Sequence, residues 1–235
     1  MNKFQNIFFD LDDTLYDFSA ASRESFHETY DLLGYDSFFS SFQEFMDIYT
    51  PRNLELWKEY GKGTITKDEL NKQRYNHPLQ VVGIHDEELA ARFCREALSR
   101  IPTKNILIPG AIEILEYLYP KYNLYILSNG FQELQAHKMQ TAGLSKYFKR
   151  LILSDHIGIN KPRRELFEYA LESTSSQLEE SIMIGDMFET DIAGAANIGM
   201  AQIFFNRQGI SPLPFAPTYE ITKLSEIRGD RKSVV

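Results

Sequence analysis

Acidic residues follow the first apolar run of this chain at a spacing that suits metal-dependent chemistry. Asp10 and Asp12 come directly after the run at 4–9. Residues two apart in an extended chain project to the same side, so both carboxylates should face one small site. Like charges that close repel each other unless a proton or a cation lies between them. A hard divalent cation held by carboxylates, a backbone carbonyl and water would resolve that conflict.

Three further polar clusters follow later apolar runs. Their members are Ser128, Asn129, Lys161 and Asp186. The carboxyl ends of parallel strands meet at one edge of a sheet, where ligands bind. We therefore expect acids, a lysine and hydroxyl groups to converge on one crevice, with Asp186 as the third anchor of the cation.

Each of these residues also has an ordinary structural explanation. Aspartates commonly cap turns, Ser128 and Asn129 could cap the helix that follows them, and Lys161 could be a plain loop lysine before a proline. Asp191 lies where an acid near a helix start is favourable anyway, and we expect any metal role for it to be indirect. The agreement of four clusters in one order favours the metal site over these explanations.

Short apolar runs alternate with helical patterns along most of the chain. The runs lie at 4–9, 123–127, 150–153, 181–184 and 200–205, and the helical patterns at 111–119, 132–142, 165–172 and 192–196. This alternation predicts an α/β fold, a Rossmann-like parallel sheet core with helices on both faces.

The segment between the first run and Pro109 breaks this alternation. It is roughly ninety residues long, several times the length of a usual crossover. Apolar residues recur in it at helical spacing, namely Phe38, Phe39, Phe42, Phe45, Met46 and Tyr49, then Leu89, Phe93, Ala97 and Leu98. We predict a catalytic core at 1–16 and 106–235 and an inserted α-helical cap, or lid, domain at 17–105.

Composition excludes several classes of protein. The formal net charge of −8 argues against nucleic-acid polymers as partners, because binding them requires Lys and Arg to neutralise phosphates. Cys94 is the only cysteine, which excludes an internal disulfide and indicates a reducing compartment.

No apolar stretch approaches the ~18 residues of a membrane span, and the first apolar stretch is too short for a signal peptide. We expect a cytoplasmic protein with no membrane partner, polar fraying residues at 228–235, and an oligomeric state left open, a monomer included.

The four clusters, in this order, resemble the haloacid dehalogenase superfamily of phosphatases, over 1–16 and 106–235. The resemblance implies that Asp10 attacks phosphorus to form an aspartyl-phosphate and that Asp12 is the acid and base. It implies Mg²⁺ held by Asp10, the Asp12 backbone carbonyl and Asp186, with Asp191 behind them. The phosphoryl-binding set that it implies is Thr14, Ser128, Asn129 and Lys161.

Further stretches resemble the pyrimidine 5′-nucleotidase branch of that superfamily. They lie at 128–135, 141–144, 161–162 and 167–171, and in the inserted segment at 53–60 and 63–66. The branch implies hydrolysis of nucleoside monophosphates, including noncanonical pyrimidine nucleotides, so the expected partner is a small phosphorylated metabolite. Asn53, Trp57 and Lys58 then become candidates for contacts with the base, although ordinary packing explains them equally well.

Alternative functions remain open within this chemistry. They are a phosphatase for another metabolite such as a sugar phosphate, a phosphomutase, a 2-haloacid dehalogenase and a non-catalytic binding module. A departing halide needs no proton, so an acid at position 12 favours phosphate esters over dehalogenation. A binding module should have lost at least one of Asp10, Asp12, Lys161 and Asp186, and all four are present.

Two departures from the family pattern are Asp13 and Met187, neither of which removes a catalytic group.

Overall fold

The computed structural model describes residues 4–228, so most of the predicted fraying segment at 228–235 lies outside the described residues. The chain divides into two compact units, Met1–Ser19 with Asn105–Val235 and Ala20–Lys104. Among the described residues, no helix combines the length and the apolar character that a membrane crossing requires.

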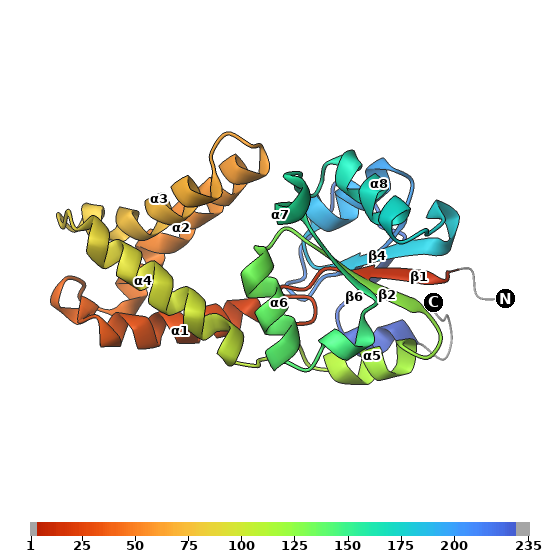
Figure 1. Cartoon of the computed structure of the whole chain (residues 1–235), viewed down its shortest axis with the longest axis horizontal. Coiled ribbons are helices and arrows are strands. Elements are labelled where there is room, and N and C mark those ends of the chain that lie inside the picture. Colours follow the sequence, from red (N-terminus) through yellow and green to blue (C-terminus); the bar gives the residue numbers. More distant parts are fainter. Residues whose placement is uncertain (1–3, 229–235) are drawn as a thin grey trace. The chain divides into compact units, whose positions relative to one another are not determined.

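A six-stranded parallel sheet forms the centre of the first unit (Figure 1). Its strands are β1 (Asn6–Phe9), β2 (Asn123–Ser128), β3 (Arg150–Leu153), β4 (Ser181–Gly185), β5 (Ala201–Phe205) and β6 (Tyr219–Ile221). They lie in the order β3-β2-β1-β4-β5-β6, which is the order of Rossmann-like sheets. The predicted fold class is confirmed. The sequence patterns did not predict β6, which has only three residues and is a strand because it pairs with β5.

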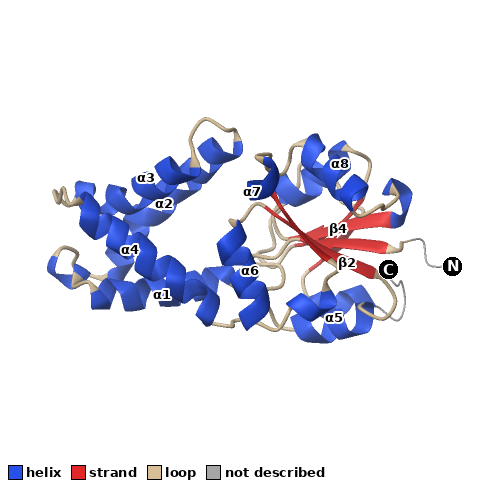
Figure 2. Ribbon diagram, in the orientation of Figure 1, coloured by secondary structure: helices blue, strands red, loops and turns tan. Residues whose placement is uncertain are grey.

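Helices cover both faces of this sheet, with α8 on one side and α5 on the other (Figure 2). They are α5 (Ala111–Leu118), α6 (Gln132–Thr141), α7 (Ser154–Ile157), α8 (Arg164–Ser173) and α9 (Ala193–Asn197), the last preceded by a π-helical turn at Phe188–Ile192. All residues of β1 are buried, as expected for a parallel strand covered on both faces. Phe8 of β1 packs in one core with Phe167 of α8 and Ala195 of α9.

The position of β1 between β2 and β4 brings three polar strand ends together. Phe9 at the end of β1 pairs with Ile126 and Ile184 on its two sides. The backbone N–H of Asp10 donates to the carbonyl of Ile184 at 2.8 Å, which ties the start of the loop after β1 to β4. The chain passes to opposite sides of β1 for β2 and β4, and such a switch point is where open α/β sheets bind ligands.

The second unit is helical. Its elements are α1 (Phe18–Leu32, which begins in the first unit), α2 (Phe42–Gly61), α3 (Lys67–Val81) and α4 (Glu87–Arg100). The last three begin at side-chain caps, since Ser41, Thr66 and Asp86 each accept a hydrogen bond from the backbone N–H three residues later. The helical spacing expected from Phe38 onward is therefore wrong at its start, because the Ser41 cap starts the helix at Phe42 and leaves Phe38 and Phe39 before it.

Aromatic side chains form the core of this helical unit. The ring centroid of Phe93 on α4 lies 5.6 Å from that of Phe26, 4.9 Å from Tyr35, 5.1 Å from Phe45 and 5.7 Å from Tyr75. Phe93 is 1% exposed. Such ring pairs add to the stabilisation that burial alone supplies.

We expect Phe93→Ala to lower the free energy of unfolding of the helical unit by about 3–5 kcal/mol, because the surrounding side chains cannot completely fill the cavity left by the lost ring. Urea denaturation followed by near-UV circular dichroism measures the change. Leu54→Ala, at an exposed position on α2, is the control and should change stability by no more than about 0.5 kcal/mol. Equal effects of the two substitutions would contradict the central position of Phe93.

Candidate functional site

A buried lysine connects the acids at the carboxyl end of the sheet. The Nζ atom of Lys161 lies 2.7 Å from Asp10 Oδ1 and 2.7 Å from Asp191 Oδ1, and it donates to the carbonyl of Leu127 at 2.8 Å. The side chain of Lys161 is only 3% exposed. All three donor positions of this ammonium group therefore have acceptors, two of them carboxylates.

Asp186 approaches the same place from the end of β4. Thr14 donates its hydroxyl hydrogen to Asp186 Oδ1 at 2.9 Å, so the loop after β1 orients the acid after β4. Thr14 is fully buried. In this structure Thr14 positions an acid, and the phosphoryl contact expected of it stays a prediction.

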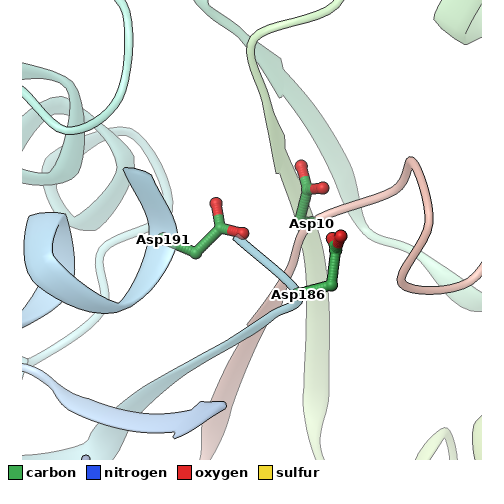
Figure 3. A group of neighbouring side chains, drawn as sticks. All are labelled: Asp10, Asp186 and Asp191. Carbon is green, nitrogen blue, oxygen red and sulfur yellow. The ribbon is translucent and has the colours of Figure 1, made fainter. Parts of the chain in front are cut away.

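Asp10, Asp186 and Asp191 form a group that could hold a metal ion. Each offers a carboxylate oxygen, and these atoms all lie within 4.8 Å of one another. Figure 3 shows the three carboxylates gathered at the ends of β1 and β4 and on the turn after β4. Oxygen donors of this kind suit Mg²⁺. With all three carboxylates ionised, these acids and Lys161 together carry two negative charges, which a divalent cation balances.

The electrostatics of this group reflect its burial. Burial raises the pKa of Asp10 to about 7, with Lys161 opposing the shift and Asp191 reinforcing it. Burial raises the pKa of Asp186 to about 8, reinforced by Asp10 and Asp191 and opposed by the Thr14 hydrogen bond. Burial by itself would lower the pKa of Lys161, but Asp10 and Asp191 keep it above its usual value. The cluster without a metal thus favours retaining a proton.

Gly185 makes room for Asp191. A Cβ atom at Gly185 would lie 2.2 Å from Asp191 Oδ2, so only glycine permits the approach. The same oxygen accepts a hydrogen bond at 3.1 Å from the backbone N–H of Met187. Met187 itself is 51% exposed, and this departure from the family pattern leaves the acids undisturbed.

Asn129 supports the lysine loop with both ends of its amide. Its Nδ2 atom donates to the Lys161 carbonyl at 3.0 Å, and its Oδ1 atom accepts from the Lys161 N–H at 2.8 Å. Ser128 is buried, and its Oγ atom accepts from the Gly130 N–H at 3.1 Å. The structure places Asn129 beside Lys161 and Ser128 directly after Leu127, whose carbonyl accepts from Lys161, whereas the phosphate contacts of both residues stay predictions.

Asp12 has two partners on α6 that the sequence patterns did not reveal. Lys138 forms an ion pair with Asp12 Oδ1, and Gln135 Nε2 donates to Asp12 Oδ2 at 2.9 Å. Gln135 and Lys138 stand three residues apart and so lie on one face of the helix. That spacing was the available signal, but nothing local connects it to Asp12, which is more than a hundred positions away.

Asp13 lies in the loop between β1 and α1. Its φ of 57° is left-handed, a conformation that aspartate tolerates better than most residues. Its carboxylate accepts from the N–H and the hydroxyl of Ser19, at 2.9 and 2.8 Å.

A cavity of about 250 Å³ lies between Asp13, Asp186, Asn206 and Arg207, beside the acid cluster. The segment that follows β5 therefore also borders this site.

The candidate specificity residues Asn53, Trp57 and Lys58 all lie on α2. Asn53 and Trp57 are half-buried and Lys58 is exposed. Arg74 of α3, which the sequence patterns did not single out, joins the first two. Its guanidinium lies 3.4 Å from Asn53 Oδ1 and 5.7 Å from the centroid of the Trp57 ring.

The chain is similar to known proteins over most of its length. The family described as haloacid dehalogenase-like hydrolase matches residues 4–199. Pyrimidine 5′-nucleotidase YjjG of Escherichia coli (strain K12) is 32% identical over 96% of each chain. A glyceraldehyde 3-phosphate phosphatase of Methanothermobacter thermautotrophicus is 28% identical over 86% of this chain and 85% of its own. The magnesium-bound crystal structure of YfnB from Bacillus subtilis, 27% identical, superimposes with a TM-score of 0.87, covering 96% of this chain and 97% of its own.

The raised pKa values predict how the stability of the metal-free protein depends on pH. A folded-state pKa above the unfolded value means that the folded state binds more protons, so the contribution of Asp10 and Asp186 to stability is full below about pH 4 and is lost as pH rises through about 7 to 8. Thermal unfolding with a chelator, measured between those limits, should show this fall. Asp186→Asn should flatten it, and added Mg²⁺ should restore stability at high pH. A wild-type protein whose stability depends on pH in the same way as that of Asp186→Asn would contradict the proton-retaining cluster.

Proposed function

Because this chain belongs to the haloacid dehalogenase-like hydrolases, we propose that it is a Mg²⁺-dependent phosphomonoesterase that works through an aspartyl-phosphate on Asp10. One observation carries the proposal. Asp10 is held at 2.7 Å by a buried lysine, within a group of three acids that could bind a metal. A carboxylate fixed in this way is a suitable nucleophile, and Lys161 with a bound divalent cation would neutralise the charge of the transferring group.

In the first half-reaction, an oxygen of Asp10 attacks phosphorus. A P–O bond to Asp10 forms while the P–O bond to the leaving alcohol breaks, and Asp12 gives the departing oxygen its proton. In the second half-reaction a water attacks the phosphorus of the aspartyl-phosphate and gives its proton to Asp12. The P–O bond to Asp10 breaks, and inorganic phosphate leaves. Dividing one difficult displacement into two easier steps is the advantage of covalent catalysis.

The side chains around Asp10 have separate tasks in this scheme. Lys161 neutralises charge next to the nucleophile, and hydroxyl and amide groups from Thr14, Ser128 and Asn129 would hold the phosphoryl oxygens. Asp10, the Asp12 carbonyl and Asp186 would hold Mg²⁺, with Asp191 behind them. When bound, the ion would supply charge neutralisation and orient the phosphoryl group.

The substrate class that we propose is the nucleoside monophosphates, pyrimidine ones first. This choice is supported by the branch motifs and by the 32% identity to a protein named a pyrimidine 5′-nucleotidase. A sugar-phosphate substrate is the second candidate, supported by the likeness to a glyceraldehyde 3-phosphate phosphatase. Residues 17–105 would act as a lid over the site, and such lids select substrates by what they enclose.

We expect the protein with Mg²⁺ to release phosphate from nucleoside monophosphates and Asp10→Asn to lower kcat by about 10³-fold or more, since the amide is not a nucleophile. A phosphate-release assay measures both. Asp31→Asn, the same change at an exposed site, should keep wild-type activity. Full activity of Asp10→Asn would end the proposed mechanism, and halide release from a 2-haloacid without phosphate release would indicate a dehalogenase.

Substrate choice can be tested on α2. Stacking of a base on an aromatic ring contributes about 1–3 kcal/mol, so Trp57→Ala should lower kcat/KM for uridine or thymidine monophosphate by roughly 5- to 150-fold. The value for a small sugar phosphate should change much less. Leu54→Ala on the same helix is the matched control, with 55% exposure in the wild type. If sugar phosphates are the better substrates in the wild type, or Trp57→Ala affects both classes equally, the nucleotidase assignment is wrong.

A further inference from the structure

A second lysine–aspartate pair lies next to the first. Lys138 on α6 is 0% exposed, and its ammonium group forms an ion pair with Asp12, whose side chain is 28% exposed. The same ammonium lies 5.4 Å from the centroid of the Tyr16 ring and 4.8 Å from that of Phe18. Two aromatic faces and one carboxylate therefore surround a cation removed from water.

Stability alone does not explain this pair. Burying an ammonium group has a desolvation penalty that a single ion pair often fails to offset, so a buried ion pair is by itself weak evidence of a role in stability. Gln135 has a similar cost, because its Oε1 atom is buried without a hydrogen-bond partner. Two unfavourable groups on one face of α6 both direct their donors at Asp12.

The contacts fix the orientation of the Asp12 carboxylate. Lys138 contacts Oδ1 and Gln135 contacts Oδ2, at 2.9 Å, so each oxygen has its own donor. Gln135 Nε2 also donates to Ser128 Oγ at 2.6 Å, which uses both hydrogens of its amide nitrogen. Neither the carboxylate nor the amide can rotate without losing a hydrogen bond.

Gly130 is the residue that lets Gln135 reach this position. A Cβ atom at Gly130 would lie 2.1 Å from Gln135 Nε2 and 2.4 Å from its Cδ atom. Any other residue would displace the amide. The glycine after Ser128 and Asn129 thus makes room for a side chain that contacts Asp12.

We propose that Lys138 and Gln135 are positioning residues, which hold the Asp12 carboxylate in the orientation required for proton transfer to the leaving oxygen. The proposal rests on the phosphomonoesterase function proposed above. Lys138 keeps its own protons throughout, since its task is to direct Asp12. The consequence is specific: loss of either contact should impair the step in which a leaving group needs a proton and spare steps that do not.

Leaving groups of different basicity separate this role from a structural one. An alkyl phosphate, such as a nucleoside monophosphate, must receive a proton as its alcohol departs, whereas p-nitrophenolate departs without one. The ratio kcat/KM covers steps only as far as formation of the aspartyl-phosphate, so the later hydrolysis does not enter the comparison. We expect Lys138→Met to lower kcat/KM by about 10²-fold for the alkyl phosphate, within the range of general acid catalysis, and far less for p-nitrophenyl phosphate.

Further variants and one binding measurement complete this test. Asp12→Asn should give the same selective loss, Gly130→Ala a smaller one, and Lys138→Arg should recover part of the activity. Lys146→Met, the same change at an exposed lysine, is the matched control. Lys138→Met should not weaken the calorimetric affinity for Mg²⁺, because Lys138 contacts none of the three carboxylates that could bind the ion.

Several results would overturn the proposal. Equal losses on both substrates in Lys138→Met and Gly130→Ala would assign these residues a purely structural role, and no loss in either variant would remove any role in the reaction. If Lys138→Met does not fold, Gly130→Ala and Lys138→Arg decide by the same comparison of substrates. Failure of the wild-type protein to hydrolyse either phosphate ester would instead refute the proposed function.

Discussion

The site depends on one buried lysine, Lys161, which forms ion pairs with both Asp10 and Asp191. Carboxylates at this depth repel one another strongly, and desolvation favours their protonated forms. A lysine that contacts two of them at 2.7 Å keeps the cluster together in the absence of a metal. Its backbone is held in turn by Asn129 from the end of β2. The geometry around Asp10 thus depends on strands on both sides of β1.

Asp10 and Asp12 have separate lysines, although they are only two residues apart. Lys161 comes from the loop before α8, and Lys138 comes from α6. Separate cations allow the two carboxylates to have different surroundings, one buried among acids and one partly exposed and paired with a lysine that lies over aromatic rings. Different environments are how neighbouring carboxylates acquire different roles in catalysis. The proposed nucleophile and the proposed acid therefore differ because of what packs around them.

Two glycines at strand ends serve this arrangement. Gly130 makes room for Gln135, and Gly185 makes room for Asp191, in each case at a distance that a Cβ atom would not allow. Both follow or end a strand whose carboxyl end borders the site. Absence of a side chain at these positions is as necessary to the geometry as the presence of the acids.

The sequence by itself determined the parallel strands and the polar residues at their carboxyl ends, because apolar runs and strand ends are local features. It therefore predicted the fold class and the set around Asp10, Lys161 and Asp186, but not the short strand β6. Only the tertiary structure decided that Lys138 and Gln135 face Asp12, since their distance along the chain leaves no local pattern and the pairing requires α6 to lie beside the loop that follows β1. Contacts between remote segments depend on the packing of the whole sheet, and that packing brings the second lysine to the second aspartate.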